Sequence, residues 1–352
     1  MGGIKSNMGF KTDISKIHYD KNANGRFFSL LKFCSYFYAI GSGLKNRFYD
    51  KGVLKPKKVR AYVVSVGNLT TGGVGKTPVV AQIAKYYIKK GEKVAIVSRG
   101  YGSKLNGKNI NIISDGEKIF FDAKTAGDEP FWLGDNVKGA YVITSQNRYM
   151  AAKYAIEKFG VTKIILDDGF QHRKIHRDLD IVLIDSTMGF GNENLLPAGP
   201  LREGIEAFSR IDKLVVVSKN TDHARAEKYA KIMGKKLKKE TLVCYTEPDF
   251  VYDIFNAEEK LPQGSQVLAF SAIGQPQQFY NFLKDYNVVK TLDFDDHHNY
   301  AQNDIEKLSK FGIKALVTTE KDAGKLMNLD FGDLKIFALK LKTKLDVQKL
   351  LG

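Results

Sequence analysis

The chain has 352 residues, of which 43% are hydrophobic and 27% charged, and its formal net charge is +16. This length and apolar content are those of a globular protein with room for two domains, and no repeat or low-complexity tract stands out. The two cysteines, Cys34 and Cys244, lack the spacing of a disulfide framework or a zinc site, so a reducing cytoplasm fits them best. No secretory signal is recognisable at the start of the chain.

The positive charge is concentrated near the N-terminus. Residues 1–60 carry thirteen Lys or Arg against three acids, a net charge of +10. A basic arm indicates a polyanionic partner, either nucleic acid or an anionic membrane surface, although a basic surface can also serve solubility alone. Because no recognised nucleic-acid-binding module is present, we expect no nucleic-acid partner.

Residues 26–44, RFFSLLKFCSYFYAIGSGL, are the most aromatic stretch of the chain. Polar residues recur at every third position: Arg26, Ser29, Lys32 and Ser35. On a helix this spacing gives a slanted polar stripe on an otherwise apolar cylinder. Lys32 interrupts the apolar run and GSG at 41–43 is expected to end it, short of the ~20 residues of a membrane span. We expect an interfacial helix whose following lysines meet anionic head groups; a core helix of the first domain is the alternative.

From residue 61 onwards, short apolar runs alternate with helical patterns. Strands are expected at AYVVSVG, KVAIVSRG, AYVITS, KIILDD, DIVLID and KLVVVSK, and helices over 78–90 and 148–159. This alternation predicts an α/β fold with a P-loop NTPase-like, mostly parallel sheet and helices on both faces. Such sheets bind their ligands at the carboxyl ends of the strands.

A second series of strands begins near residue 240. It comprises TLVCYT, QVLAFSAIG, VVKTLDF, KALVTTEKD and KIFALKLK, with helices near 276–286 and 301–311. We interpret this series as a second, smaller α/β domain that contributes to the active-site cleft. The lysine-rich segment near 218–240 holds the boundary, so the predicted division is a membrane-associating arm over 1–60, a P-loop domain over 61–225 and a second domain over 226–352.

The segment GNLTTGGVGKTP, residues 67–78, resembles a phosphate-binding loop. The general pattern G-x-x-x-x-G-K-[ST] requires a glycine at position 70, where this chain has Thr70, but G-x-G-K-T between a strand and a helix remains. We expect Lys76 to neutralise the β- and γ-phosphates of a nucleotide and Thr77 to place its hydroxyl on Mg²⁺; a glycine turn without a ligand is the alternative. The expected nucleotide-binding residues are Thr70, Thr71, Gly72, Gly73, Val74, Gly75, Lys76 and Thr77.

A Mg²⁺ ion on Thr77 needs carboxylates at a neighbouring strand end. The segment KIILDDGFQH supplies Asp167 and Asp168 directly after an apolar strand, like a Walker-B element. Gln171 is placed to reach the same site or to pack beneath it. The two acids could instead cap the following turn, which is the alternative reading of the pair.

Two further acidic segments are GDEP at 127–130 and FDDHH at 294–298. Taken alone, the first would cap a helix that Pro130 opens, and the second would be a polar loop. A kinase that phosphorylates a hydroxyl also needs a group within reach of that hydroxyl, and a His–Asp pairing is a common way to supply it.

Eight motifs now stand in a fixed order along the chain. They are GNLTTGGVGKTP (67–78), SRGYG (98–102), GDEP (127–130), DDGFQH (167–172), NLLPAGPLRE (194–203), FSAIGQP (270–276), FDDHH (294–298) and TEKD (319–322). Together they resemble the tetraacyldisaccharide 4′-kinase family, the lipid A 4′-kinases of Gram-negative bacteria, from about residue 27 to near the end. That family has threonine or a similar residue at the position of Thr70.

The resemblance implies a lipid kinase. Its reaction would transfer the γ-phosphate of ATP, with Mg²⁺, to the 4′-hydroxyl of an acylated disaccharide 1-phosphate at the anionic, cytoplasmic face of the inner membrane. The resemblance makes Asp128 the acid that activates the acceptor and His297 the histidine that assists it. Together with Lys76 of the loop, these are the expected catalytic residues. It also places Arg202 and Glu203 near the nucleotide, and it makes the DDG acids the Mg²⁺-side pair.

A protein of another class is the alternative interpretation. A membrane-associated P-loop ATPase that switches conformation without a lipid acceptor would explain the loop, the Mg²⁺ acids and the basic arm. It would not explain Asp128 or His297.

Overall fold

Helices and strands alternate along the chain in a computed structural model that describes residues 16–219, 223–274, 276–296 and 298–352. The elements up to residue 218 are α2 (Arg26–Asp50), β1 (Tyr62–Asn68), α3 (Lys76–Lys89), β2 (Val94–Ser98), β3 (Asn111–Asp115), α4 (Ala123–Ala126), α5 (Asp128–Asn136), β4 (Ala140–Thr144), α6 (Arg148–Phe159), β5 (Lys163–Asp167), β6 (Leu179–Asp185), the 3-10 helix η1 (Ile205–Arg210) and β7 (Lys213–Ser218). They are followed by α7 (His223–Leu237), β8 (Glu240–Asp253), β9 (Gln266–Ser271), α8 (Pro276–Phe282), β10 (Asn287–Asp293), α9 (Gln302–Ser309), β11 (Ala315–Thr319), α10 (Glu320–Leu326), β12 (Lys335–Lys344) and α11 (Val347–Leu351).

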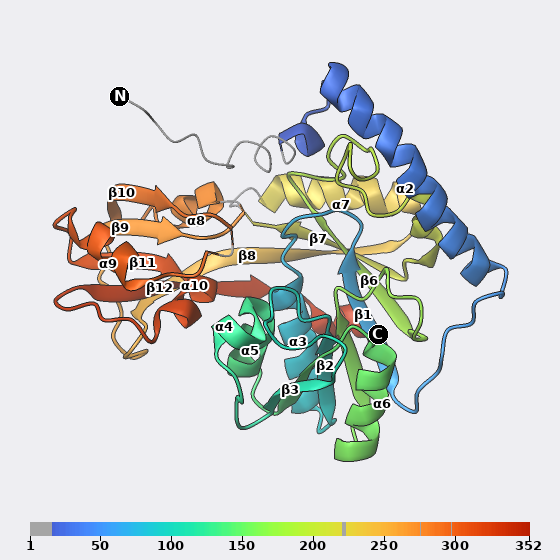
Figure 1. The fold of residues 1–352 in the computed structure, drawn as a ribbon, viewed down its shortest axis with the longest axis horizontal. Helices are drawn as coiled ribbons and strands as arrows, with labels where there is room; N and C mark the ends of the chain where they lie inside the picture. Colours follow the sequence, from blue (N-terminus) through green and yellow to red (C-terminus); the bar gives the residue numbers. More distant parts are fainter. Residues whose placement is uncertain (1–15, 220–222, 275, 297) are drawn as a thin grey trace.

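These strands form one 12-stranded sheet in the order β10-β9-β11-β12-β8-β7-β6-β1-β5-β2-β4-β3 (Figure 1). The strands from β8 to β4 are parallel, and β3 closes that edge in the antiparallel direction. At the other end, β10, β9, β11 and β12 are parallel to one another. The predicted mostly parallel sheet of a P-loop fold is therefore confirmed.

The long strand β8 joins the two ends of the sheet. Its residues 240–245 pair with β7 in the parallel direction, and residues 245–253 pair with β12 in the antiparallel direction. The two series of strands thus share one continuous sheet. The predicted boundary between residues 225 and 226 falls inside α7, which packs against β7 and β8. The division into domains stays a prediction.

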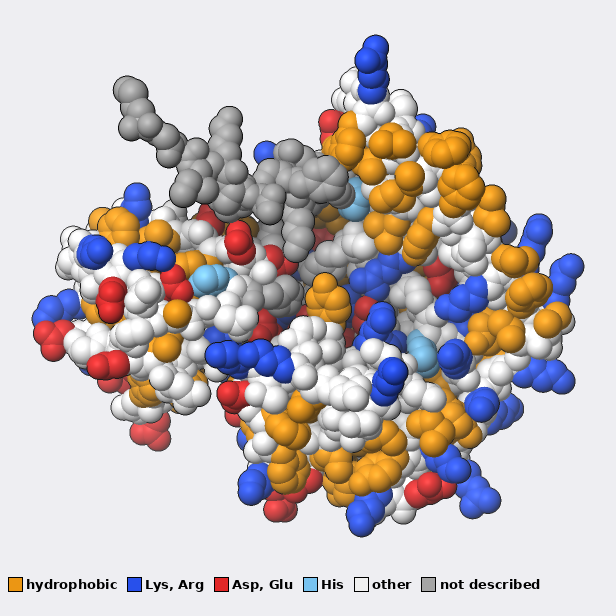
Figure 2. Space-filling view, in the orientation of Figure 1, with side chains coloured by type: hydrophobic (Ala, Val, Ile, Leu, Met, Phe, Trp, Pro, Cys, Tyr) orange, Lys and Arg blue, Asp and Glu red, His pale blue; other side chains and the backbone are white. Residues whose placement is uncertain are grey.

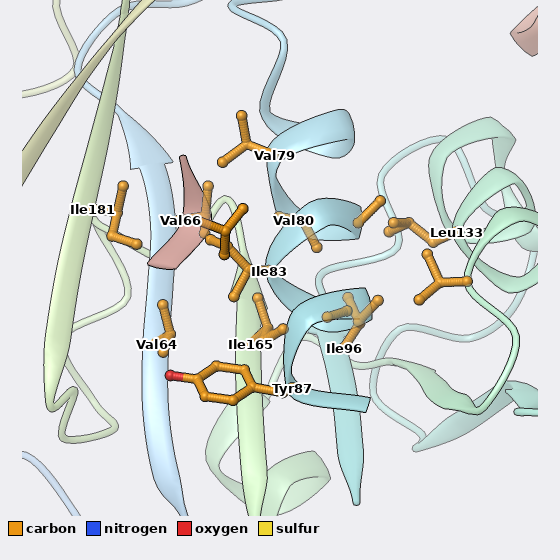
Figure 3. Close-up of a cluster of buried hydrophobic side chains, with 14 of the residues drawn as sticks. Val64, Val66, Val79, Val80, Ile83, Tyr87, Ile96, Leu133, Ile165 and Ile181 are labelled. Atoms are coloured by element: carbon orange, nitrogen blue, oxygen red, sulfur yellow. The ribbon is translucent and has the colours of Figure 1, made fainter. Parts of the chain in front are cut away.

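A buried hydrophobic cluster fixes α3 on the sheet (Figure 3). The helix residues that face the strands recur at helical spacing: Val79, Val80, Ile83 and Tyr87. The strand residues opposite them are Val64, Val66, Ile96 and Ile165. Burying one large aliphatic side chain stabilises a fold by about 1.5–3 kcal/mol. This cluster therefore holds the start of α3 at the carboxyl end of β1.

The opposite face of the sheet is covered by α6 and α7. The inward residues of α6 are Ala151, Ala152 and Ala155, and they pack on strand residues that alternate with those beneath α3. Small side chains let the helix approach the sheet closely, and the alternation follows from the period of two along a strand. Helices lie on both faces, as predicted.

Helix α2 lies on the outside of the molecule, along the upper right of Figure 1. The expected end of this helix at residues 41–43 is wrong, because α2 continues to Asp50. Its last turns are held from outside: Arg173 donates to the main-chain oxygen of Asn46 at 3.1 Å and to the Asp50 carboxylate at 2.7 Å. These contacts outweigh the low helix propensity of the two glycines.

The alternative of a core helix is also wrong for α2, because only Leu31, Ser35 and Asn46 of its 25 residues are buried. Ser35 Oγ lies 2.9 Å from the carbonyl oxygen of Leu195 and accepts the N–H of Ala198 at 3.1 Å. The helix therefore docks on the segment 194–203 by a narrow face. In the described part of the chain, α2 is the only helix long and apolar enough to span a membrane, by the test of an 18-residue window, whose mean hydropathy is 1.2.

Candidate active site

The loop between β1 and α3 has the geometry of an anion-binding site. Gly72 and Gly75 adopt φ angles of 104° and 92°, a region that glycine enters without strain. Helix α3 begins directly afterwards at Lys76, with no side-chain cap at Gly75 and no acid in its first turn. Its first N–H groups can therefore bind an anion, which the helix dipole favours at this end.

Thr70 shows why this loop needs no glycine at its first position. Thr70 is buried, and its φ is not positive, so a side chain fits without backbone strain. Its carbonyl oxygen accepts from Asn68 Nδ2 at 2.7 Å. The next residue, Thr71, donates its N–H to the carbonyl oxygen of Pro200 at 2.8 Å. The segment 194–203, on which α2 docks, thus also supports the loop.

The far side of the loop is held by Lys219, which follows β7. Lys219 Nζ donates to the main-chain oxygen of Gly73 and lies 3.0 Å from Asp185 Oδ2. Val74 between the glycines is buried. The backbone of the loop is therefore fixed from two directions before any ligand binds.

Lys76 lies between the ends of two neighbouring parallel strands. Its Nζ donates to Asn68 Oδ1 at 3.2 Å and lies 3.4 Å from Asp168 Oδ1. Asn68 ends β1 and Asp168 follows β5, and these two strands are paired. This placement agrees with the prediction that the phosphate-binding loop and the acids of the DDG motif meet at the carboxyl ends of neighbouring strands.

Asp168 is surrounded by basic groups. Arg202 Nη1 lies 3.0 and 2.8 Å from its two carboxylate oxygens, and Arg148 Nη1 donates to its main-chain oxygen at 2.7 Å. Burial opposes the charge of Asp168, but Lys76 and Arg202 outweigh that effect and lower its pKa to about 2. Asp168 is therefore fully ionised and already neutralised by the protein.

Asp167, its neighbour, is in the opposite situation. Its side chain is 2% exposed, and burial, followed by the charge of Glu129, raises its pKa to about 7. Its Oδ1 has no hydrogen-bond partner within the described residues. A buried carboxylate oxygen without a partner is costly, and a divalent cation would remove that cost. Of the two acids, Asp167 has the coordination capacity expected of a Mg²⁺ ligand.

The other predicted metal ligands are Thr77 and Gln171. Thr77 is buried in the first turn of α3, and Gln171 Nε2 donates to the main-chain oxygen of Asn68 at 2.9 Å. Across the described ranges, no three His, Cys, Asp or Glu side chains form a metal-binding group. A hydroxyl and one carboxylate fit Mg²⁺, because this ion takes most of its ligands from substrate phosphates and water.

Asp128 and Glu129 form the first turn of α5. Gly127 before them has a φ of 90°, and a Cβ built there would lie 2.9 Å from the main-chain oxygen of Tyr101. The SRGYG segment therefore packs directly against the GDEP turn, and only glycine fits at the contact. This contact fixes where the two acids enter the helix.

The first turn of α5 faces the phosphate-binding loop. The charge of Glu129 acts on Asp167, and the charge of Lys76 acts on Glu129. Burial opposes ionisation of Glu129, but Lys321 and Lys76 outweigh that effect and lower its pKa. His297, the predicted partner of Asp128, lies outside the described residues.

Glu203 occupies a separate ion pair beside the site. It is buried and pairs with Arg210, whose guanidinium lies 4.6 Å from the centre of the Phe170 ring. Burial raises the pKa of Glu203. The structure thus brings Arg202 to the DDG acids but places Glu203 with Arg210.

Several residues of this site were not predicted: Asn68, Glu129, Arg148, Lys321 and Lys325. Of these, Lys325 places its Nζ 2.9 Å from Asp128 Oδ2. Arg148 gave a usable signal, since it opens a helix whose inward residues are alanines, where a buried arginine needs a partner. Lys321 and Lys325 are four residues apart and therefore share one face of a helix. The acidic partner of Lys321, by contrast, is 192 positions away in the sequence.

The comparisons with known proteins agree on one family. The family model described as "Tetraacyldisaccharide-1-P 4'-kinase" matches residues 27–351. Curated relatives named "Tetraacyldisaccharide 4'-kinase" include one from Halothermothrix orenii, 36% identical over 82% of this chain and 80% of that protein. Another, from Desulfotalea psychrophila, is 37% identical over 80% of this chain and 83% of that protein.

A solved structure is also similar. The crystal structure described as an "apo" form of LpxK from Aquifex aeolicus in complex with ATP is 34% identical, with a TM-score of 0.74, over 93% of this chain and 97% of that one. The matched residues agree with the expected resemblance, which runs from about residue 27 to near the end of the chain. The chain therefore belongs to the tetraacyldisaccharide 4′-kinase family.

Proposed function

We propose that the chain transfers the γ-phosphate of ATP to the 4′-hydroxyl of a tetraacyldisaccharide 1-phosphate at a membrane surface. Its family makes it a kinase of lipid A biosynthesis. The residue assignments rest on one observation at the carboxyl ends of the parallel strands. There, Lys76 at the start of α3 lies close enough to Glu129 in the first turn of α5 to lower its pKa, and Asp128 precedes Glu129 in that turn.

The nucleotide side of the reaction is assigned to the loop. Its backbone N–H groups and Lys76 bind the β- and γ-phosphates and stabilise the charge of the transferring phosphoryl group. Thr77 and Asp167 would hold Mg²⁺, which neutralises phosphate charge when bound. Asp168 acts differently in this proposal, because it fixes Lys76 and Arg202 rather than a metal.

The acceptor side is assigned to Asp128. It accepts a hydrogen bond from the 4′-hydroxyl and takes its proton as the oxygen bonds to phosphorus and the bond to the β-phosphate oxygen breaks. Phosphoryl transfer through a loose transition state needs little base assistance, so a correctly placed ionised carboxylate is sufficient. His297 is proposed to assist Asp128, as the resemblance implies.

Access to a lipid acceptor is assigned to α2. An apolar stripe runs along its outer face, with residues that are each half exposed or more: Leu30, Phe33, Phe37, Ile40 and Leu44. Figure 2 shows hydrophobic side chains along the upper right of the molecule, where α2 lies. The basic residues that follow the stripe are Lys45, Arg47, Lys51, Lys55, Lys57, Lys58 and Arg60. This arrangement suits an interfacial helix on an anionic membrane.

Transfer of radiolabel from γ-labelled ATP tests the function directly. We expect label in the lipid with wild-type protein, and a loss of at least about 10²-fold in kcat for Lys76→Ala. Asp128→Ala should lower kcat by about 10²–10⁴-fold, with a smaller change in the KM for ATP. Label released as free phosphate, at a rate independent of the lipid, would instead support the ATPase switch.

A further inference from the structure

Helix α10 carries two lysines that meet the two acids at the start of α5. Lys325 Nζ lies 2.9 Å from Asp128 Oδ2, and Lys321 Nζ lies 2.9 Å from Glu129 Oε1. The lysines are one helical turn apart and therefore point the same way, toward two adjacent acids. Two neighbouring ion pairs thus connect α10, the helix that follows β11, to the first turn of α5.

Lys325 is itself held from behind by Asp322. Its Nζ lies 3.3 Å from Asp322 Oδ1, and the lysine and aspartate side chains are 3% and 0% exposed. Asp322 Oδ2 accepts the N–H of Ala272, just after β9, at 3.0 Å and the hydroxyl of Thr319 at 2.9 Å. A fixed chain of contacts therefore runs from the end of β9 through Asp322 and Lys325 to Asp128.

The packing of α10 on α5 leaves little tolerance. A Cβ built on Gly324 would lie 3.0 Å from Phe131 Cε1, which is tighter than ordinary contact. The glycine between the two lysines thus lets α10 approach α5 closely enough for both ion pairs to form. Residues 319–325, TEKDAGK, supply every part of this arrangement. Thr319 caps the start of α10, Asp322 is the buried aspartate, Gly324 allows the close approach, and Lys321 and Lys325 form the two ion pairs.

We propose that Lys325, backed by Asp322, is a positioning residue for the phosphoryl acceptor site: it fixes the orientation of the Asp128 carboxylate. This inference rests on the proposed function, in which Asp128 receives the 4′-hydroxyl. Lys325 reaches Asp128 from α10, and Asp322 ties α10 to the end of β9. The Asp128 carboxylate is therefore placed by contacts from these two elements as well as by its own helix, α5. Lys321 holds Glu129 in the same way, one turn earlier.

A double-mutant cycle on lipid phosphorylation tests the proposal. Lys325→Met is expected to lower kcat by about 10²-fold, as a displacement near 1 Å can, while the KM for ATP changes less than about twofold. In an Asp128→Asn background the same substitution should cost almost nothing further, because the group that it positions is gone. Equal losses in both backgrounds, or a wild-type kcat for Lys325→Met, would overturn the proposal.

A second variant covers the case in which Lys325→Met does not fold, since it leaves Asp322 buried without its cation. Gly324→Ala keeps every charge but places a methyl group 3.0 Å from Phe131 Cε1, so that the packing of α10 on α5 must adjust. We expect this shift to lower kcat at an unchanged KM for ATP. Lys340→Met is the matched control. It removes the ion pair between Lys340 Nζ and Oε1 of Glu320, which are 3.2 Å apart. Glu320 is on α10, like Lys325, and we expect kcat to be unaltered. A wild-type kcat for a folded Gly324→Ala protein would also overturn the proposal.

The outcome separates this inference from the proposed function. If Asp128→Asn itself retains wild-type kcat, or no label enters the lipid, the assignment of Asp128 or of the reaction fails. If Asp128→Asn is impaired and either folded variant, Lys325→Met or Gly324→Ala, retains wild-type kcat, only the positioning role fails.

Discussion

Arg202 Nη1 lies 3.0 and 2.8 Å from the two carboxylate oxygens of Asp168. The adjacent Asp167 makes no such contact: its Oδ1 has no hydrogen-bond partner in the part of the chain that the structure describes. Neighbours in sequence thus differ in their electrostatic environment, because the strand ends between them and the chain turns at Asp168, whose φ is 53°. The two acids cannot substitute for each other.

We predict that Asp167→Asn and Asp168→Asn have separable effects. Asp167→Asn should raise the Mg²⁺ concentration for half-maximal activity by about tenfold or more, because it removes the carboxylate that we propose as a ligand. Asp168→Asn should lower kcat with little change in that concentration, because Lys76 and Arg202 lose their anionic partner. A Mg²⁺ titration of lipid phosphorylation measures both quantities. The assignment is wrong if the two variants shift the Mg²⁺ requirement equally.

The sequence predicted the elements that local patterns define. The helix over 148–159 has the predicted ends because Asn147 caps its start, accepting the N–H of Met150, and Gly160 ends it with a φ of 66°. The strand β3 was not predicted, since its residues NIISD are few and only partly apolar. The phosphate loop was recognisable because its function requires glycines at fixed spacing.

Tertiary contacts set what the sequence left undetermined. Nothing in the motif DDG indicates which acid is neutralised, since the answer depends on Arg202, 34 positions away. The length of α2 likewise depends on Arg173, which no helical pattern includes. The pairing of Lys321 with Glu129 joins segments 192 positions apart. Periodicity describes one element at a time and therefore cannot predict such pairings.

We predict that Gly67→Ala destabilises the fold by about 1–3 kcal/mol, the usual cost of overpacking. A Cβ at Gly67 would lie 2.6 Å from the Cβ of Phe170, where the DDGF turn crosses β1. Gly41→Ala is the matched control: its Cβ meets nothing within 4 Å in the middle of α2, so it should stabilise by about 0.5–1 kcal/mol. Urea midpoints measure both, and equal stability of Gly67→Ala and wild type would contradict the close approach.

We predict that His172 makes the folded state less stable as pH falls from about 6.5 to about 4. Burial, followed by the charge of Arg148, lowers the pKa of His172 from 6.5 to about 4. Between these values the unfolded chain binds more protons than the folded one, so stability is lost as pH decreases. His172→Gln should therefore show a flatter fall of the urea midpoint between pH 6.5 and pH 4.5.

The control for this measurement is His176→Gln, at a histidine whose side chain is 41% exposed. Asp167 also titrates in this range, but with the opposite slope, since its raised pKa favours the folded state at low pH. The contribution of Asp167 is present in the wild type, in His172→Gln and in His176→Gln. It therefore cancels in the difference between each variant and the wild type. A fall as steep in His172→Gln as in wild type would show that His172 is not the group responsible.

The membrane prediction needs point substitutions rather than removal of the N-terminal helix. Deleting α2 would also remove Ser35, which contacts Leu195 and Ala198 in the segment that supports the phosphate loop. Lost activity in a deletion would then have two causes. Substitutions on the outer face of α2 leave this docking face intact.

We therefore predict that Phe33→Gln, Phe37→Gln and Ile40→Gln, combined in one protein, release it from phosphatidylglycerol vesicles at both low and high salt, because they remove the apolar side chains that we propose enter the membrane. Neutralising three of the following lysines to Gln, at 51, 55 and 58, should weaken binding by about 3 kcal/mol at low salt and less at high salt, since each contributes about 1 kcal/mol and is screened. The matched control replaces three exposed apolar residues elsewhere, Phe255, Val289 and Phe311, with Gln. All variants should retain ATP binding, because the phosphate loop is untouched. Vesicle co-sedimentation gives the answer: if the α2 variant binds as well as the control, the membrane contact lies on another surface of the protein.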